Sequence, residues 1–317
     1  MSLAALLLAA CCAAAMGFAI QRGATCAVVA VEEVIAQRSA RRLAAMAEAS
    51  LWVAGGLVVA QEAGLLPAMP AGYPLGWQTL AGGVLLGLGA VLNGACTFGA
   101  VARLGRGEWA FAATPTGFFL GCLAFAPLFG AVMPAPLPQG SPVLAAPGWI
   151  ALPVAGAMAW RLARTARVDA RAWTPHRATV VIALAFVVML PAVGAWAYTD
   201  ALAAIAAGMA SGHGVRALLL VALLAGAVAG GWSAGLLGWI RPAPGQALRC
   251  LAGGAIMAWG GMLVPGANDG LILVGMPLLF PYAWAAFATM CAAIAAAKLA
   301  TRRPPAPSAA PPRRPAA

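Results

Sequence analysis

Long apolar stretches recur along the chain and are separated by short polar or basic segments. A stretch of about 20 apolar residues is long enough to cross the hydrocarbon core of a bilayer as a helix. By this measure the pattern predicts nine transmembrane helices, which we place near residues 2–20, 44–62, 76–92, 108–132, 148–164, 179–198, 217–239, 247–264 and 280–298.

Four further apolar pieces are too short to cross a membrane and lie near residues 22–37, 95–105, 199–213 and 267–278. We expect them to be re-entrant or half-helices, because a helix end inside a membrane is tolerated only where protein or a polar path surrounds it. The predicted fold class is therefore an all-α polytopic membrane protein with about nine transmembrane helices and additional short re-entrant helices.

The composition agrees with this interpretation. The 317 residues are 63% hydrophobic and 9% charged, with a mean hydropathy of +0.90, whereas soluble domains carry about 25% charged residues. The net charge of +11 comes from Arg clusters between the apolar stretches, which is the distribution of the positive-inside rule and gives no indication of nucleic-acid binding. Placing these clusters on the cytoplasmic side of the membrane puts the N-terminus outside and the C-terminus inside.

Two blocks of sequence recur in the same order. Residues 80–99 (LAGGVLLGLGAVLNGACTFG) align without a gap with residues 251–270 (LAGGAIMAWGGMLVPGANDG), and residues 53–56 match residues 228–231. The expected topology runs the two copies in opposite directions across the membrane, so the sequence predicts two inverted repeats.

These repeats define the expected domains. Residues 1–147 form the first repeat and its periplasmic loop, and residues 179–299 form the second. Residues 148–178 supply a linking span and a basic cytoplasmic loop. Residues 300–317 are rich in Pro, Ala and Arg and are expected to be a disordered cytoplasmic tail.

Polar residues interrupt apolar sequence at two positions in the first half. One is Asn93-Gly94-Ala95-Cys96-Thr97, where a helix beginning near residue 95 would present free N–H groups and its positive dipole end to an anion. We expect Asn93, Cys96 and Thr97 to line a substrate path there. The other is the segment 21–26, which offers Gln21, Arg22 and Cys26; for Arg22, a cytoplasmic anchor at the membrane surface is an equally good interpretation.

In the second copy the interruption contains Asn268 and Asp269. An acidic residue inside a membrane indicates a functional group. The alternative, which we favour, is that Asp269 caps the short helix at 270–276 while Asn268 faces the path. Asp200 and His213 are interpreted as loop residues.

The remaining cysteines, at positions 11, 12, 122, 250 and 291, lie within continuous apolar stretches and are expected to be small buried hydrophobes. There is no CxxC motif and no Cys–His spacing suited to zinc, so we predict no metal site, no cofactor and no catalytic residue. The sequence also lacks GxxxxGK[ST], which argues against ATP-driven transport by this chain alone.

At these positions the sequence resembles the YeeE/YedE family of bacterial sulfur-compound transporters. The resemblance covers most of residues 10–298 and rests on Gly17-Phe18, Arg22-Gly23 leading to Cys26, residues 92–99, Arg103-Leu104-Gly105, Gly117-Phe118, the LAGG blocks and residues 265–270.

The resemblance implies an inner-membrane carrier for thiosulfate, built from two inverted halves that meet at a constriction, where Cys26 and Cys96 relay the anion through weak thiol–sulfur hydrogen bonds. Thiosulfate-type members usually have a Cys in the second-half break, where this sequence reads PGANDG. Asn268 would then replace one thiol contact, and a related sulfur anion becomes a candidate substrate. The implied partners are a small sulfur-containing anion, the lipid bilayer and, as a candidate, a small soluble sulfur-carrier protein.

Two other functions remain open on the sequence alone. One is a membrane thiol oxidoreductase that passes electrons between Cys26 and Cys96. The other is a channel or carrier for another small solute, in which the polar breaks are satisfied by neighbouring helices.

Overall fold

The structure, a computed structural model, describes residues 2–130, 132–166, 173–208 and 212–301, and this part of the chain is helical and contains no β-strand. The first half consists of α1 (Leu3–Gly23), α2 (Ala27–Gln37), α3 (Arg41–Glu62), α4 (Trp77–Asn93), α5 (Thr97–Leu104) and α6 (Ala113–Phe129). After α7 (Ala151–Ala166) the second half consists of α8 (Pro175–Val193), α9 (Tyr198–Ala206), α10 (His213–Ser233), α11 (Pro244–Leu263), α12 (Ala267–Gly270) with the π-helix Leu271–Gly275, and α13 (Pro281–Ala300). The predicted tail at 300–317 lies almost wholly outside the described residues.

The architecture is that of a polytopic membrane protein, as predicted. Among the described residues, seven helical segments are long and apolar enough to cross a membrane, or eight if α11 and the segment bent from it by 44° count as one. Large apolar side chains such as Leu51, Leu152 and Val221 are exposed on the outside of the bundle, where lipid would cover them. Because α7 has only 16 residues, the predicted count of nine spans stays a prediction.

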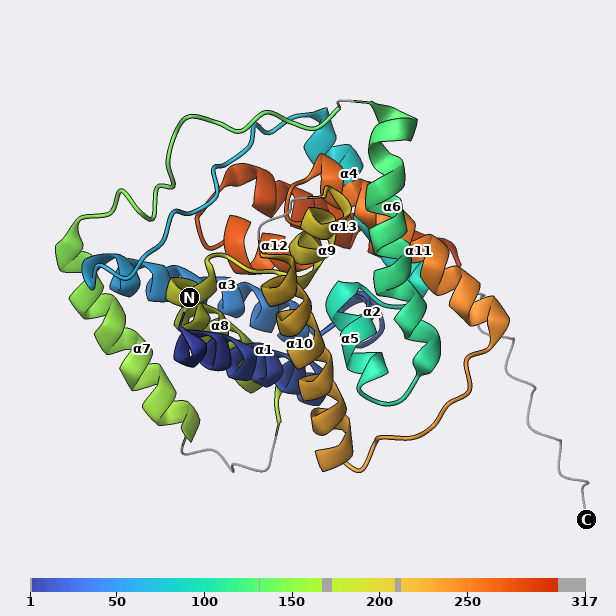
Figure 1. The fold of residues 1–317 in the computed structure, drawn as a ribbon, viewed down its shortest axis with the longest axis horizontal. Coiled ribbons are helices and arrows are strands. Elements are labelled where there is room, and N and C mark those ends of the chain that lie inside the picture. The colour runs from blue at the N-terminus through green and yellow to red at the C-terminus, as the bar shows by residue number, and fades with distance from the viewer. Residues whose placement is uncertain (1, 131, 167–172, 209–211, 302–317) are drawn as a thin grey trace, which may run out of the picture.

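The four predicted short pieces correspond to α2, α5, α9 and α12 with its π-helix. In Figure 1 these short helices lie in the middle of the view, with long helices around them. Each break contains a residue with a positive φ: Ala24 at 47°, Gly94 at 82°, Gly194 at 73° and Gly266 at 113°. Ala24, Gly94 and Gly194 are the residues at which α1, α4 and α8 end, and Gly266 is the residue at which α12 begins. Each long helix therefore stops inside the protein and a short helix begins there.

The long helices pack in an arrangement that repeats between the halves. α1 packs against α8 and α10, and α8 also packs against α3; α4 packs against α11 and α13, and α11 also packs against α6. This set of neighbours is unchanged when each helix is exchanged with its counterpart in the other half: α1 with α8, α3 with α10, α4 with α11, and α6 with α13. The packing therefore interleaves the two halves.

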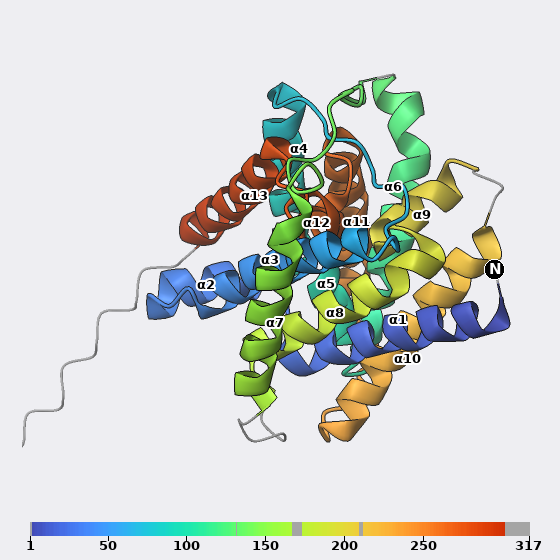
Figure 2. The ribbon, with the colours of Figure 1, turned by 90° about the vertical axis from the view of Figure 1, so that its left-hand side faces the viewer.

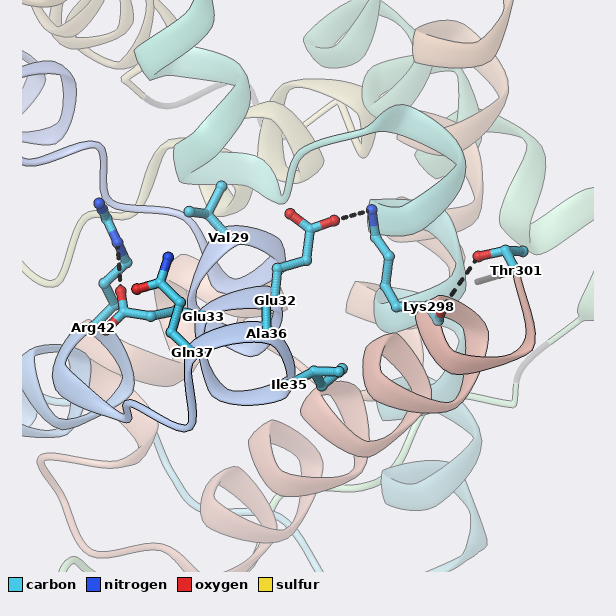
Figure 3. A pocket seen from close by; sticks show the side chains of 9 residues that line it. All are labelled: Val29, Glu32, Glu33, Ile35, Ala36, Gln37, Arg42, Lys298 and Thr301. Atoms are coloured by element: carbon cyan, nitrogen blue, oxygen red, sulfur yellow. Dashed lines mark hydrogen bonds and ion pairs between the residues drawn. The ribbon is translucent and has the colours of Figure 1, made fainter. Parts of the chain in front are cut away.

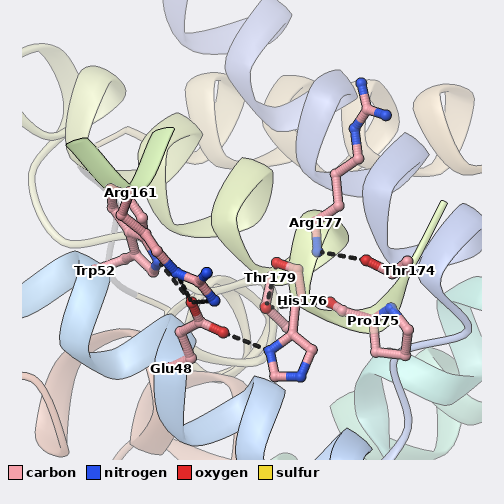
Figure 4. A network of polar contacts seen from close by, with 8 residues as sticks. All are labelled: Glu48, Trp52, Arg161, Thr174, Pro175, His176, Arg177 and Thr179. Carbon is pink, nitrogen blue, oxygen red and sulfur yellow. Dashed lines mark hydrogen bonds and ion pairs between the residues drawn. The ribbon is translucent and has the colours of Figure 1, made fainter. Parts of the chain in front are cut away.

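One carboxylate joins α7 to the rest of the bundle (Figure 4). Glu48 on α3 accepts hydrogen bonds from Arg161 of α7 at 3.1 Å and from the indole N–H of Trp52 at 3.4 Å, and it pairs with His176 at the start of α8. Since this network connects three helices, it fixes the position of the linking helix. Figure 2 shows α2 and the end of α13 on the side opposite the N-terminus.

Candidate functional site

The N-terminal ends of the four short helices meet in one hydrogen-bonded network. The backbone N–H of Ala27, in the first turn of α2, donates to Cys96 Sγ at 3.1 Å, next to the start of α5. The Tyr198 hydroxyl, at the start of α9, donates to the Thr97 carbonyl at 2.9 Å. The Thr97 hydroxyl in turn donates to Asn268 Oδ1 on α12. Four segments that are far apart in the sequence thus converge on one buried point.

Two thiols lie at this junction. Cys26 and Cys96 each occupy the N-cap position of a short helix, and their Sγ atoms are 3.8 Å apart, with the Cys96 thiol as donor. Both side chains are buried and neither is in a disulfide. A Cβ built on Gly99 would lie 2.5 Å from Cys26 Sγ, so a glycine at this position lets the two sulfurs approach. The structure therefore brings the two predicted path thiols into contact.

Asn93 stabilises the first break through hydrogen bonds within the protein. Its Nδ2 donates to the Ala95 carbonyl at 2.6 Å, and its Oδ1 accepts from the Thr114 hydroxyl at 2.8 Å. Both ends of the amide are therefore used within the protein. The side chain holds the turn between α4 and α5. From the sequence alone, a polar residue with this role looks the same as one that lines a path.

Asn268 differs from Asn93 because half of its amide is unused. Its Oδ1 accepts from Thr97, but its Nδ2 has no hydrogen-bond partner among the described residues, although the side chain is only 1% exposed. A buried donor without a partner costs roughly 1–3 kcal/mol. Of the two predicted site residues in the second half, Asn268 is therefore the one with an unpaired donor that could bind a ligand.

Asp269 connects two of the short helices. Its carboxylate accepts from the backbone N–H of Thr199 at 3.1 Å and from the Thr199 hydroxyl. These donors belong to the first turn of α9, so Asp269 satisfies the start of α9 in addition to lying in α12, whereas the sequence suggested a cap on the short helix at 270–276. Asp200 and His213 lie in α9 and α10, so their interpretation as loop residues was wrong.

Gln21 and Arg22 are placed differently from the thiols. Gln21 is buried between α1, α5 and α10, and neither polar atom of its side chain has a hydrogen-bond partner among the described residues. The Arg22 guanidinium lies 5.9 Å from the centroid of the Trp173 ring. Within the described part of the chain, Arg22 forms no hydrogen bond with Cys26 or Cys96.

A cavity of about 410 Å³ reaches the second break from one side. Sequence reasoning missed its polar lining, which comprises Tyr73, Trp196, Asp200 and Arg216. Asp200 lies so close to the break that a Cβ on Gly270 would be 3.0 Å from its Oδ2. In the loop before α4, burial and then the Asp200 carboxylate raise the pKa of Tyr73, which keeps its hydroxyl protonated. These residues come from three separate segments, so no single local signal identifies the set.

Two further cavities lie beside the first break and α2. A small one of about 10 Å³ is lined by Thr25, Cys26, Arg42 and Thr179, among others. A larger one of about 550 Å³ is lined by Glu32, Glu33, Arg42 and Lys298 and their neighbours (Figure 3). Cys26 therefore lines a cavity at the first break, and Gly266 and Gly270 line another at the second break. Among the described residues no group of three or more His, Cys, Asp or Glu side chains is arranged to hold a metal ion.

Comparison with known proteins identifies the family. The search of curated proteins finds no match. A scan against protein-family models matches residues 22–296 to the family described as sulphur transport. The matched region includes both thiols, both breaks and all the helices from α2 to most of α13. The chain therefore belongs to the YeeE/YedE sulphur transport family.

Proposed function

We propose that this protein carries a small sulfur-containing anion, with thiosulfate as the first candidate, across a bacterial inner membrane through the junction of the short helices. One observation carries the proposal: two thiols are in contact at the starts of α2 and α5, and cavities open beside Cys26 and beside the second break. Family membership supports transport of a sulfur compound, and the contacts at the junction support the more specific substrate.

The chemistry of the junction suits a passing anion. The starts of α2 and α5 supply backbone N–H groups and positive dipole ends, which favour negative charge. Thiols are weak, polarisable donors. Conduction requires binding that is strong enough for entry and weak enough for release, so a pair of thiols at helix starts provides moderate attraction without trapping the anion.

The unused Nδ2 of Asn268 adds a stronger donor. An amide N–H suits a terminal oxygen of an oxyanion, whereas a thiol suits its sulfur end. In this proposal Asn268 takes the place of the second-half thiol of thiosulfate-type relatives, so the substrate presents oxygen to Asn268 and sulfur to Cys96. An anion with both kinds of terminal atom fits this arrangement best. Thr97 holds the amide in position through its bond to Oδ1.

The proposal includes an inverted repeat made of residues 1–147 and 179–299. It is supported by the exchangeable helix neighbours and by the antiparallel contact of α4 with α11, in which Gly82 lies against Gly260 and Gly89 against Gly253. Equivalent helices of an inverted repeat run in opposite directions. Basic residues at the ends of α2, α7 and α13 support an N-terminus outside and a C-terminus inside. A small soluble sulfur-carrier protein is the proposed cytoplasmic partner.

A second candidate function is favoured by the same sulfur–sulfur contact. At 3.8 Å the thiols of Cys26 and Cys96 are neighbours, as a membrane thiol oxidoreductase would require. A disulfide has sulfurs about 2.05 Å apart, so the pair would have to move closer to react. Replacement of Cys96 by Ser distinguishes the two functions: a hydroxyl still donates a hydrogen bond to an anion, but it cannot form a disulfide.

The experiment is growth of a bacterial strain that lacks its own sulfur uptake systems, with thiosulfate as the sole sulfur source. We expect growth with the native chain, none with Cys96→Ala and reduced growth with Cys96→Ser. Cys291→Ala is the matched control, because Cys291 lies on α13 away from the junction. Growth of Cys96→Ala at the native rate would refute the thiol path. Equal loss of growth in Cys96→Ala and Cys96→Ser, together with a Cys26–Cys96 disulfide trapped in the native chain, would favour the oxidoreductase.

A further inference from the structure

Arg42 stands between the thiol pair and the large cavity of about 550 Å³. It lines that cavity and also the small cavity beside Cys26. Its Nη1 donates to the carbonyls of Gly23 at 3.3 Å and Ala24 at 3.1 Å, and its Nε pairs with Glu33 at 2.8 Å. One side chain thus forms a wall shared by the two cavities, and Figure 3 shows its contact with Glu33.

The groups that Arg42 holds belong to the break itself. Gly23 is the last residue of α1 and Ala24 caps it, three and two residues before Cys26 respectively, and Ala24 has a left-handed φ of 47°. Glu33 lies on α2 and also accepts from the Ser39 hydroxyl at 2.7 Å. Arg42, on α3, therefore ties the turn before Cys26 and the helix after it to a third helix.

The small cavity contains an independent indication of a ligand. The Thr25 hydroxyl is one of its lining groups, is only 7% exposed and has no hydrogen-bond partner among the described residues. A buried hydroxyl without a partner calls for an explanation such as a ligand that binds there transiently. An anion that leaves Cys26 on this side would meet the Thr25 hydroxyl first and the Arg42 guanidinium next.

We propose that Arg42 is the inner anion-binding residue of this transporter and also the latch that closes its path toward the large cavity. This inference rests on the proposed function. The guanidinium offers a planar fork of N–H groups that matches an oxyanion. An oxyanion attracts the guanidinium with a full negative charge, whereas the carbonyls of Gly23 and Ala24 offer only dipoles, so an arriving oxyanion displaces the two carbonyls from Nη1. The turn before Cys26 is then released and the small cavity joins the large one.

The test measures access to Cys26 in the full chain. Cys26 is kept as the single cysteine, with the other six replaced by Ala, and membrane vesicles of both orientations are treated with a membrane-impermeant maleimide. We expect Arg42→Ala to raise the labelling rate from the Arg42 side by about tenfold, the scale of losing one hydrogen bond to a charged group. Glu33→Gln keeps the guanidinium and should give a smaller increase. Arg41→Ala is the control, because Arg41 is the exposed neighbour on the same helix.

Thiosulfate tests the binding role. It should slow the labelling of Glu33→Gln and leave Arg42→Ala unaffected. An unchanged rate in both Arg42→Ala and Glu33→Gln would overturn the latch, and equal protection of Arg42→Ala by thiosulfate would overturn the binding role. Neither measurement requires transport. If the native chain grows on thiosulfate but the labelling rates do not change as expected, only the Arg42 proposal is refuted. Loss of growth in the native chain refutes the proposed function instead.

Discussion

Gly89 on α4 and Gly253 on α11 lie face to face, so that a Cβ built on either one would lie 2.8 or 2.7 Å from the carbonyl oxygen of the other. Gly82 and Gly260 form the same reciprocal contact, at 2.9 and 2.7 Å. The sequence repeat aligns Gly82 with Gly253 and Gly89 with Gly260, so each contact is the counterpart of the other. This close crossing brings the ends of α4 and α11, and with them both polar breaks, to the centre of the protein.

Replacement of Gly253 by Val should destabilise the protein more than most substitutions in these helices. The added atoms would meet backbone, which cannot move as a flexible side chain can. We expect a loss of roughly 1–3 kcal/mol or more, as for overpacked interiors. Thermal unfolding in detergent measures it. Gly156→Val on α7 is the control, because a Cβ there meets open space, and an equal effect of both substitutions would contradict the close crossing.

Gly99→Ala tests whether the two thiols must touch. The new methyl group would lie 2.5 Å from Cys26 Sγ and should push it away from Cys96. We expect the initial rate of thiosulfate uptake to fall by roughly tenfold, which corresponds to a barrier higher by about 1.4 kcal/mol, with little change in unfolding temperature. Gly214→Ala on α10 serves as the control, since nothing lies near its Cβ position. Native uptake by Gly99→Ala would show that sulfur contact is dispensable.

Asn268→Asp is the sharpest test of the second-half break. Aspartate has nearly the same shape and still accepts the hydrogen bond from Thr97, but it replaces the unused Nδ2 donor with a negatively charged oxygen. Because like charges in contact cost several kcal/mol, anion uptake should fall by at least roughly tenfold. Measured thiosulfate uptake that stays at the native level would mean that Nδ2 does not face the path. Asn268→Cys should restore a relay of thiols and retain uptake.

Substitutions of Asp269 separate a capping role from a path role. Asp269→Asn keeps one oxygen that accepts from the Thr199 backbone N–H, and its Nδ2 can donate to the Thr199 hydroxyl. Uptake should therefore remain near the native level if the carboxylate serves to hold α9 to α12. Asp269→Ala leaves the buried Thr199 N–H without this acceptor and should cost about 1–3 kcal/mol of stability. Uptake and unfolding are measured on the same preparations. A large rise in anion uptake by Asp269→Asn would instead indicate that the charge faces the path and repels the substrate.

The sequence predicts the short helices well because their causes are local. Gly94 ends α4 and Gly266 begins α12, each with left-handed backbone, and the polar residues that follow them lie in otherwise apolar sequence. The contact between Cys26 and Cys96 is different, because it depends on how α2 and α5 pack and no spacing encodes it. The resemblance to a family implied that both cysteines relay the anion, and the structure shows how close their sulfur atoms are.

Other features of the site could not be predicted, because the sequence around each residue already fits a different interpretation. Arg42 belongs to a basic cluster that the positive-inside rule already accounts for, so its contacts with the α1–α2 turn gave no separate signal. Asn93 is polar in an apolar segment, as a path residue would be, yet both ends of its amide are bonded within the protein. Trp196, Asp200 and Arg216 line one cavity only because α9 and α10 fold back over the second break.

The interleaving of the two halves has a consequence for how the protein is made. The long helices of the first half find their main neighbours in the second: α1 packs against α8 and α10, and α4 packs against α11 and α13. During synthesis these helices emerge before their partners exist, and domains generally fold as units. The first six helices therefore lack most of their packing partners when they enter the membrane. A chain that stops after α7 would lack the helices against which α1 and α4 pack. Assembly of the described residues is completed only when α13 has been inserted.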